Sequence, residues 1–181
     1  ATLLKGVYPS IKALKIESYL SPDSIGPATI ANIDDYYATT AQAVSFLSND
    51  VDVSVDLHVD DKPGRSDMLT VIAAKLDQCD ISALTRPLAD RLAKMQSYVP
   101  GYTLQSHPRY ENGELIVEVS VRGQGDWIPE YAGNLDIINC AALVIAEKYA
   151  MARTGAAQQA VTHEEPGMWQ LMLNRMRGMF G

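Results

Sequence analysis

The feature that most constrains the fold of this chain is a hairpin signal at Glu111-Asn112-Gly113. It stands between two runs typical of strands, Tyr102 to Tyr110 and Leu115 to Val121. Asn-Gly is the preferred pair for a two-residue turn between antiparallel strands, because both turn residues need a positive φ. We therefore predict an antiparallel strand pair here, which already excludes an all-helical domain.

The remaining segments predict an α+β domain. Apolar and polar residues alternate from Val51 to Val59, which indicates a half-buried strand. The apolar run from Met68 to Leu76 predicts a central strand, and Lys15 to Leu20 a further one. Helical spacing predicts helices at residues 3–14, 33–47 and 81–98, and composition predicts a loop at 21–29. This order favours a mixed or antiparallel sheet covered by helices, in a domain spanning residues 1–153.

A second turn signal lies at Tyr131–Ile137, where Gly133-Asn134 leads into an Ala-rich apolar run to Tyr149. We interpret it as the start of a buried helix, with Asn134 as the N-cap. Unpaired N–H groups at a helix start favour polar or anionic ligands. Asn134 is therefore either a cap alone or a cap that also faces a ligand.

The chain changes character near its C-terminal end. Residues 154–165 are small and polar, which is typical of a linker. Residues 168–180 form a Met-rich amphipathic pattern, with Trp169, Leu173, Met176 and Phe180 on one side. This predicted tail helix either docks on the domain's own core or binds a second subunit or partner.

Charge and cysteine content exclude several classes of function. The formal net charge is −7, and no basic cluster is present, so nucleic acid and anionic membranes are not expected partners. Cys79 and Cys140 lie far apart without a metal-ligand pattern, so neither a disulfide framework nor a metal site is expected. We see no signal peptide and no membrane-spanning run, which together with the thiols indicates a reducing cytoplasm.

Four stretches of the chain carry a resemblance to a known family. They are residues 24–34 (Ser-Ile-Gly-Pro-Ala-Thr-Ile-Ala-Asn-Ile-Asp), 65–67 (Arg-Ser-Asp), 98–102 (Tyr-Val-Pro-Gly-Tyr) and 131–137 (Tyr-Ala-Gly-Asn-Leu-Asp-Ile). Over residues 1–150 the chain resembles the C-terminal substrate and dimerisation domain of the NAD-dependent acylating acetaldehyde dehydrogenases. These enzymes make acyl-CoA from an aldehyde and coenzyme A, beside a 4-hydroxy-2-oxovalerate aldolase. The resemblance implies a semialdehyde-dehydrogenase-type fold and a homodimer.

The resemblance also implies a ligand-binding cleft. Residues 24–32 match the NAD-contacting loop of the family, and Asn134 matches the Asn beside the nicotinamide. The implied substrate-binding residues are Ser24, Gly26, Pro27, Thr29, Asn32, Gly133 and Asp136. The family has Lys, Gly and Arg where this chain has Asp23, Ala28 and Ile30, so cations that would pair with phosphate are replaced.

Two parts of the family pattern do not occur in this sequence. No strand–GxGxxG–helix unit is present, and the nucleophilic Cys of the family precedes an Ala-Thr pair, whereas this sequence starts at Ala1-Thr2. We therefore expect no cofactor for this chain alone, although the family uses NAD and coenzyme A.

Three functions are compatible with these observations. The first is cofactor-free acid/base chemistry of the isomerase, lyase or cyclase type on a small carbonyl compound. Asp67 or Asp34 would serve as general acid or base, and Asn134 would polarise the carbonyl oxygen. The second is a truncated or domain-only part of an acylating acetaldehyde dehydrogenase. The third is a non-catalytic dimerisation scaffold that holds an aldolase-like partner through residues 168–180.

Overall fold

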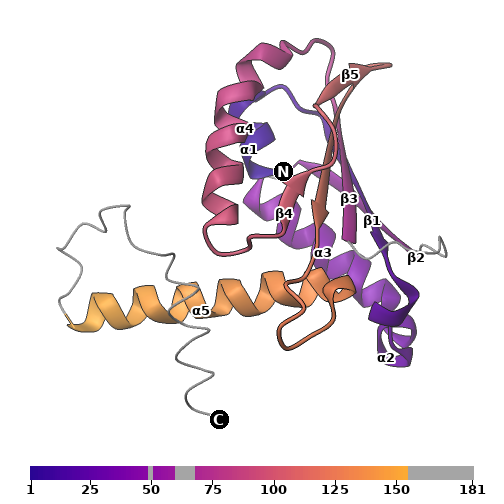
Figure 1. Ribbon diagram of the computed structural model, residues 1–181. Coiled ribbons are helices and arrows are strands. Elements are labelled where there is room, and N and C mark those ends of the chain that lie inside the picture. The colour runs from indigo at the N-terminus through magenta and orange to yellow at the C-terminus, as the bar shows by residue number, and fades with distance from the viewer. Residues whose placement is uncertain (49–50, 60–67, 155–181) are drawn as a thin grey trace.

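A mixed sheet forms the centre of the computed structural model, which describes residues 1–48, 51–59 and 68–154 (Figure 1). Its strands run in the order β2-β1-β3-β6-β4, and β5 also pairs with β6. Among the described strands, β1 and β2 form the only parallel pair, and the other pairs are antiparallel. The α+β prediction with a mixed sheet is confirmed. The strands are β1 (Ala13–Leu20), β2 (Asp52–Val59), β3 (Met68–Lys75), β4 (Tyr102–Leu104), β5 (Arg109–Glu111) and β6 (Glu114–Val121).

The parallel pair β1–β2 is joined by α3 (Ile33–Leu47), because parallel neighbours need a crossover connection. Tyr37 of α3 holds the backbone of β2, its hydroxyl donating to the Leu57 carbonyl at 3.4 Å and accepting from the Leu57 N–H at 3.3 Å. The predicted helix at 33–47 and the strands at 51–59 and 68–76 are confirmed. β3 lies between β1 and β6, the central position that its apolar run predicted.

The predicted hairpin is present between β5 and β6. Glu111 pairs with Glu114, and the turn residues Asn112 and Gly113 have φ values of 53° and 82°, as a two-residue turn requires. The prediction of one strand over 102–110 is wrong, since β4 and β5 are separate pieces on either side of residues 105–108. Pro108 explains the interruption, because it has no N–H to donate to the ladder.

Three helices cover one face of the sheet, which we call the inner face (Figure 1). They are α1 (Thr2–Val7), α3 and α4 (Ile81–Gln96). The predicted helix at 3–14 is wrong beyond Val7, because the chain from Ala13 pairs with β2 and β3 and becomes β1. The core between the helices and the inner face contains Leu4, Tyr8, Ile11, Leu14, Val51, Ala74, Leu76, Leu84, Leu115, Val117 and Val119.

The segment predicted as a loop at 21–29 contains two short helices, η1 (Pro22–Ser24) and α2 (Pro27–Ala31). Each has Pro within its first two positions, where the missing N–H has no cost. The loop prediction therefore underestimated local order in this segment. The predicted tail helix at 168–180, and the linker before it from residue 155, lie outside the described residues.

The last described helix, α5 (Gly133–Thr154), follows the short turn η2 (Glu130–Ala132) and extends away from the sheet (Figure 1). Near its start, Ile137 and Cys140 pack with Val99 and Val121. Further along, Ile138, Ile145 and Tyr149 are 63%, 67% and 62% exposed. The prediction of a buried helix is therefore wrong for most of α5, because no other described helix or strand lies over its outer turns.

Candidate functional site

Three of the four motif stretches lie within the described residues, and these three converge at one end of the sheet. β1 ends at Leu20 and β6 ends at Val121, while β3 and β4 begin there. The register places Val121 opposite both Met68 and Tyr102. Segments 21–34, 98–102 and 122–137 therefore meet around this end. Asp67, the predicted general acid or base, lies outside the described residues.

The turn η1 packs against η2, so the segment of Ser24 lies beside the turn that precedes Gly133. Hydrogen bonds within the segment order it. The Ser24 hydroxyl donates to the Ser21 carbonyl at 2.8 Å, and the Ser21 hydroxyl accepts from the Asp23 N–H at 3.3 Å. The contact between η1 and η2 thus brings together two segments that are about a hundred residues apart in sequence.

Two motif glycines have a steric role at this end of the sheet. A Cβ on Gly133 would overlap the carbonyl oxygen of Val121, and a Cβ on Gly101 would overlap that of Arg122. The Arg122 N–H donates to the Gly101 carbonyl at 3.1 Å, which ties the start of β4 to the end of β6. The substrate-binding role predicted for Gly133 is untested. The structure gives this residue a packing function.

Asn134 is the second residue of α5, and its prediction as the N-cap is wrong. The chain passes directly from η2 into α5, and Gly133 already has helical dihedrals of −56° and −28°, so no extended residue is available as a cap at this point. The Asn134 Oδ1 is buried and has no hydrogen-bond partner among the described residues. Buried side-chain acceptors are usually satisfied, so this atom has capacity for a donor from another group.

Asp136 turns back toward the loop before α5. Its Oδ2 accepts from the Gln124 N–H at 2.8 Å, and a Cβ on Gly123 would lie 3.0 Å from the same oxygen. Asp136 therefore holds the 123–125 loop against the first turn of α5. Its predicted contact with substrate stays a prediction.

The other predicted site residues lie along α2 and the start of α3. Gly26 precedes α2 as its N-cap, and Pro27 is its first residue. The Asn32 Nδ2 donates to the Ala28 carbonyl at 2.8 Å and makes no side-chain cap to α3. Asp34 lies exposed in the first turn of α3, and Thr29 lies in α2. Their substrate and catalytic roles stay predictions.

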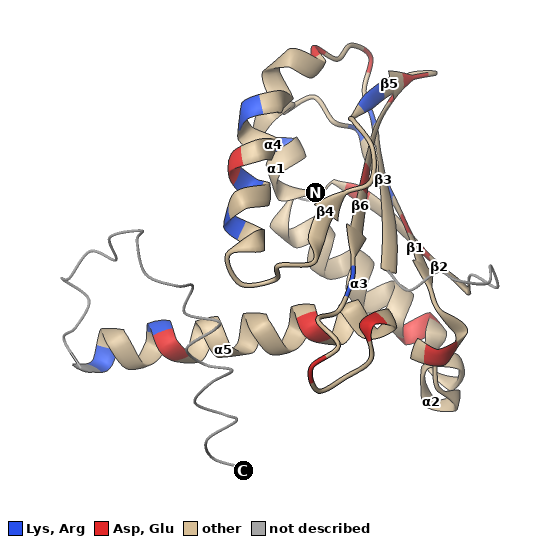
Figure 2. Cartoon of the chain, in the orientation of Figure 1, with Lys and Arg blue, Asp and Glu red and all other residues tan. Residues whose placement is uncertain are grey.

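The surroundings of this end of the sheet are acidic. Figure 2 shows acidic residues at the start of α5 and in the loop beside it. Asp23, Asp34, Glu130 and Asp136 occupy the first turns of η1, α3, η2 and α5. Arg122 is paired, because its Nε donates to Glu130 Oε2 at 3.0 Å. The local charge therefore favours a neutral or cationic ligand group over a phosphate.

Cys140 lies on the side of α5 that packs against the sheet. It is buried and packs with Val99, Val121 and the partly buried Ile137. Burial, together with the nearby charge of Asp136, raises the pKa of the thiol. A thiol with a raised pKa is a poor nucleophile.

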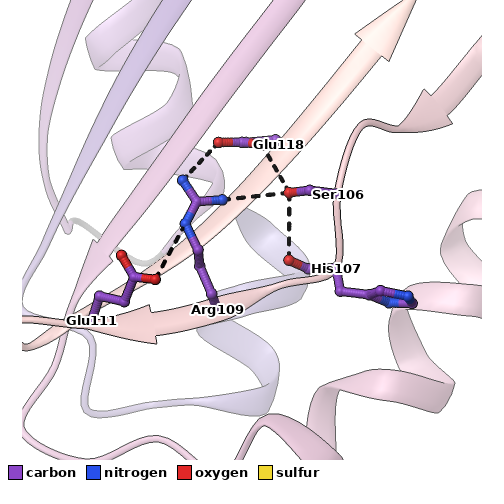
Figure 3. A network of polar contacts seen from close by, with 5 residues as sticks. All are labelled: Ser106, His107, Arg109, Glu111 and Glu118. Atoms are coloured by element: carbon purple, nitrogen blue, oxygen red, sulfur yellow. Dashed lines mark hydrogen bonds and ion pairs between the residues drawn. The ribbon is translucent and has the colours of Figure 1, made fainter.

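A second polar cluster, which sequence reasoning missed, lies on β5 and β6 (Figure 3). Arg109 Nη2 lies 2.7 Å from Glu118 Oε1, and the Ser106 hydroxyl donates to Glu118 Oε2 at 2.8 Å. Arg109 Nε lies 3.7 Å from Glu111 Oε1. The hydrogen bond from Arg109 lowers the pKa of Glu118 most, and the hydrogen bond from Ser106 lowers it further. The opposite charges of Arg109 and Glu118 on the two sides of the predicted hairpin were the sequence signal that could have predicted this cluster.

The described residues contain no group of three or more His, Cys, Asp or Glu side chains placed to hold a metal ion. Within the same residues, no helix combines the length and the apolar character needed to cross a membrane.

The fold and site define an α+β domain with helices on one face of a mixed sheet and loop motifs gathered at one end. Residues 3–129 match the family described as prokaryotic acetaldehyde dehydrogenase, dimerisation, so the chain belongs to that family. The resemblance predicted from the four motif stretches is confirmed.

Curated relatives agree with this assignment. The chain is 43% identical over 143 residues to an acetaldehyde dehydrogenase of Spirochaeta aurantia, a match that covers 79% of this chain and 48% of the relative. It is 35% identical over 155 residues to one of Pectobacterium atrosepticum, covering 86% and 52%. The chain thus spans about half the length of these relatives. Among solved structures, aspartate semialdehyde dehydrogenase II of Vibrio cholerae is similar, with a TM-score of 0.42 and 12% identity, over 80% of this chain and 55% of that one.

Proposed function

We propose that this chain is the dimerisation-domain part of an acylating acetaldehyde dehydrogenase, built to act beside a nucleotide-binding part. The proposal corresponds to the domain-only alternative, which the family assignment supports better than cofactor-free acid/base chemistry. The relatives contain about as much sequence again as this chain matches. That additional sequence is the source we propose for the rest of the active site.

The observation that carries this proposal is the apolar surface of α5. From Ile137 to Ala146, Asn139 is the only polar residue, so apolar side chains point in every direction around the helix. Helices that are apolar on all sides are normally buried. We therefore expect another protein surface to bury the exposed Ile138 and Ile145. A second domain resting on α5 would supply it and would lie next to Asn134.

The roles of the site residues follow from this arrangement. Asn134 would offer its unpaired Oδ1 to a donor group of the bound ligand, and the 24–32 segment would form the neighbouring wall. NAD and coenzyme A would be held mainly by the second part. The replacement of the family's Lys and Arg by Asp23 and Ile30 supports weak dinucleotide binding by this chain alone, since each charge-assisted contact contributes about 1.5–3 kcal/mol.

Co-expression tests this function. The chain would be produced together with the part of the Spirochaeta aurantia relative that it does not match. The two parts should co-purify, amide exchange should slow around residues 138–149, and NAD- and CoA-dependent oxidation of acetaldehyde should appear. Ile145→Lys should abolish association, because it puts a charge into the covered surface. Phe46→Lys is the matched control, since Phe46 is 78% exposed on α3.

Two results would overturn the proposal. One is a failure of the two parts to associate when both are folded. The other is turnover of a small carbonyl compound by this chain alone, without NAD, at a rate that Asn134→Ala abolishes. That second result would restore cofactor-free acid/base chemistry as the function.

A further inference from the structure

The exposed apolar side chains of α5 form one straight row, which we call the α5 stripe. Its members are Leu135, Ile138, Ala142, Ile145 and Tyr149, all of them exposed. The four large side chains among them are 45%, 63%, 67% and 62% exposed. Successive members are alternately three and four residues apart, which puts them on one side of the helix. The same spacing forms the contact seam between two packed helices.

The α5 stripe points away from the sheet. Ile137 and Cys140, which pack with Val121 at the end of β6, lie on the opposite side of the helix. Figure 1 shows that the later turns of α5 extend beyond the sheet. The described part of the chain therefore leaves the stripe open to solvent. Exposed apolar surface of this extent is typical of an interaction site.

The sequence after α5 contains a second row with the same spacing. Within residues 168–180, which we call the tail segment, Trp169, Leu173, Met176 and Phe180 are four, three and four residues apart. As a helix, Trp169 to Phe180 would extend over about 17 Å, which fits within the about 21 Å between Leu135 and Tyr149. Two helices with such rows can pack seam to seam.

The connection is long enough for the tail segment to reach the α5 stripe of its own chain. α5 ends at Thr154, and residues 155–167 lead from it to the tail segment. An extended connection of that length covers roughly 40 Å. The axes of packed helices are only about 8–10 Å apart. The chain can therefore turn back after α5 and place the tail segment along it.

Charge favours an antiparallel direction for this return. Residues 166–181 contain Arg175 and Arg177 and no Asp or Glu. Acidic residues gather at the start of α5, where Asp136 lies in the first turn, and in the loop beside it (Figure 2). The last turn of α5 contains Arg153 instead. An antiparallel tail segment would bring both arginines toward the acidic start of α5 and away from Arg153.

We propose that the tail segment packs as an antiparallel helix on the α5 stripe of its own chain, and that the nucleotide-binding part must displace it to reach α5. The displacement rests on the proposed function, which assigns Ile138 and Ile145 to the contact with that part. The tail segment would shield the apolar stripe of the separate chain. It would also lower the apparent affinity for the second part by the fraction of molecules in which the stripe is open.

Tryptophan fluorescence of the full chain tests the packing. Trp127→Phe removes the other tryptophan, so that the emission comes from Trp169 alone. This emission should be blue-shifted and protected from acrylamide. Leu173→Glu puts a charge into the contact, so the emission should shift to the red and be quenched more strongly. Leu171→Glu is the matched control, because it makes the same change on the opposite side of the tail helix and should leave Trp169 protected.

Two further variants keep this test independent of any single substitution. Met176→Glu should act like Leu173→Glu, and Ile145→Lys should expose Trp169 from the other side of the contact. Phe46→Lys, on the exposed surface of α3, should leave Trp169 protected. Far-UV circular dichroism verifies that each variant is folded.

Titration with the unmatched part of the Spirochaeta aurantia relative tests the displacement. If the tail segment is docked in about nine of ten molecules, Leu173→Glu should raise the apparent affinity about 10-fold over the wild-type chain. Leu171→Glu should bind like the wild-type chain. In the single-tryptophan chain, binding of the second part should make Trp169 accessible to acrylamide.

Four results would overturn the inference. They are a Trp169 as accessible in the wild-type tail as after Leu173→Glu, an equal effect of Leu171→Glu, association that Leu173→Glu does not strengthen, and protection of Trp169 that falls on dilution. The last result would place the tail segment on the α5 of a second copy. Protection of Trp169 without any association of the two parts would instead refute the proposed function and leave the packing of the tail segment standing.

Discussion

Arg109 and Glu118 lie diagonally across the β5–β6 hairpin, with Arg109 Nη2 2.7 Å from Glu118 Oε1, and both point away from the inner face of the sheet. The Arg109 side chain is 38% exposed and that of Glu118 is 19% exposed. The pair is therefore partly shielded from solvent. It joins the short edge strand β5 to β6, which supports the sheet at the position where Pro108 interrupts pairing.

The first prediction concerns the pH dependence of this pair. Because hydrogen bonds from Arg109 and Ser106 lower the pKa of folded Glu118, the stability they contribute is present above the ordinary Glu value of 4.5 and is lost as pH falls through the lowered pKa. Arg109→Ala should lower the free energy of unfolding at pH 7, and this loss should shrink as the pH falls below 4.5 and Glu118 becomes protonated. Urea unfolding at fixed protein concentration measures it.

A matched control is Lys12→Ala, which breaks the Lys12–Asp77 ion pair. Lys12 Nζ lies 2.7 Å from Asp77 Oδ2, the same distance as in the Arg109–Glu118 pair, but the two side chains are 57% and 79% exposed. Water and salt screen such an exposed pair, so the loss of unfolding free energy should be smaller than that caused by Arg109→Ala. A cost of Arg109→Ala that does not change with pH would contradict an electrostatic origin.

The second prediction concerns the hairpin turn. Gly113 has a φ of +82°, and a Cβ there would meet nothing closer than the Leu76 carbonyl oxygen at 3.9 Å. Space is therefore available, and only the backbone conformation disfavours a side chain. Gly113→Ala should lower the free energy of unfolding by about 1–2 kcal/mol. Gly26→Ala, at a φ of −90° in open space, should change it by less than about 0.5 kcal/mol. Equal losses in thermal unfolding would refute the conformational explanation.

The third prediction concerns Gly133, where helix propensity favours alanine and packing disfavours it. In an exposed helix, Gly→Ala stabilises by about 1 kcal/mol, and Gly6→Ala in α1, with nothing near its Cβ, should show this gain. At Gly133 the new Cβ overlaps the backbone of Val121, which cannot move without disturbing β6. We expect a net loss of about 1–3 kcal/mol and faster amide exchange in the first turns of α5. A gain at Gly133 would show that α5 docks loosely.

The fourth prediction separates stability from function at Asn134. Its Oδ1 has no partner among the described residues, so Asn134→Leu removes a buried unsatisfied acceptor. The free energy of unfolding should stay within about 1 kcal/mol of wild type or rise. Activity of the enzyme assembled with its complementary part should be lost. A loss of stability above about 2 kcal/mol in chemical unfolding would mean that the amide is structurally bonded.

Local rules in the sequence by themselves determined most of the elements. The Asn112-Gly113 turn, the alternation along β2 and the apolar run of β3 depend on neighbouring residues, and each was predicted within a residue or two. The four motif stretches likewise identified the family before the fold was known. Such features are readable because dihedral preferences and periodicity are properties of short segments.

Contacts between distant segments decided the rest. The predicted helix at 3–14 ends at Val7, and its last two residues belong to β1, because pairing of the chain from Ala13 with β2 and β3 outweighs weak helical propensity. The Gly133-Asn134 pair, predicted as a helix cap, lies inside α5 instead: Gly133 packs against Val121, and the Asn134 Oδ1 is buried. The predicted ligand contact of these residues stays a prediction. The exposure of α5 also became visible only in the tertiary structure. Burial depends on which surfaces meet, whereas apolar composition indicates only that a helix is normally buried.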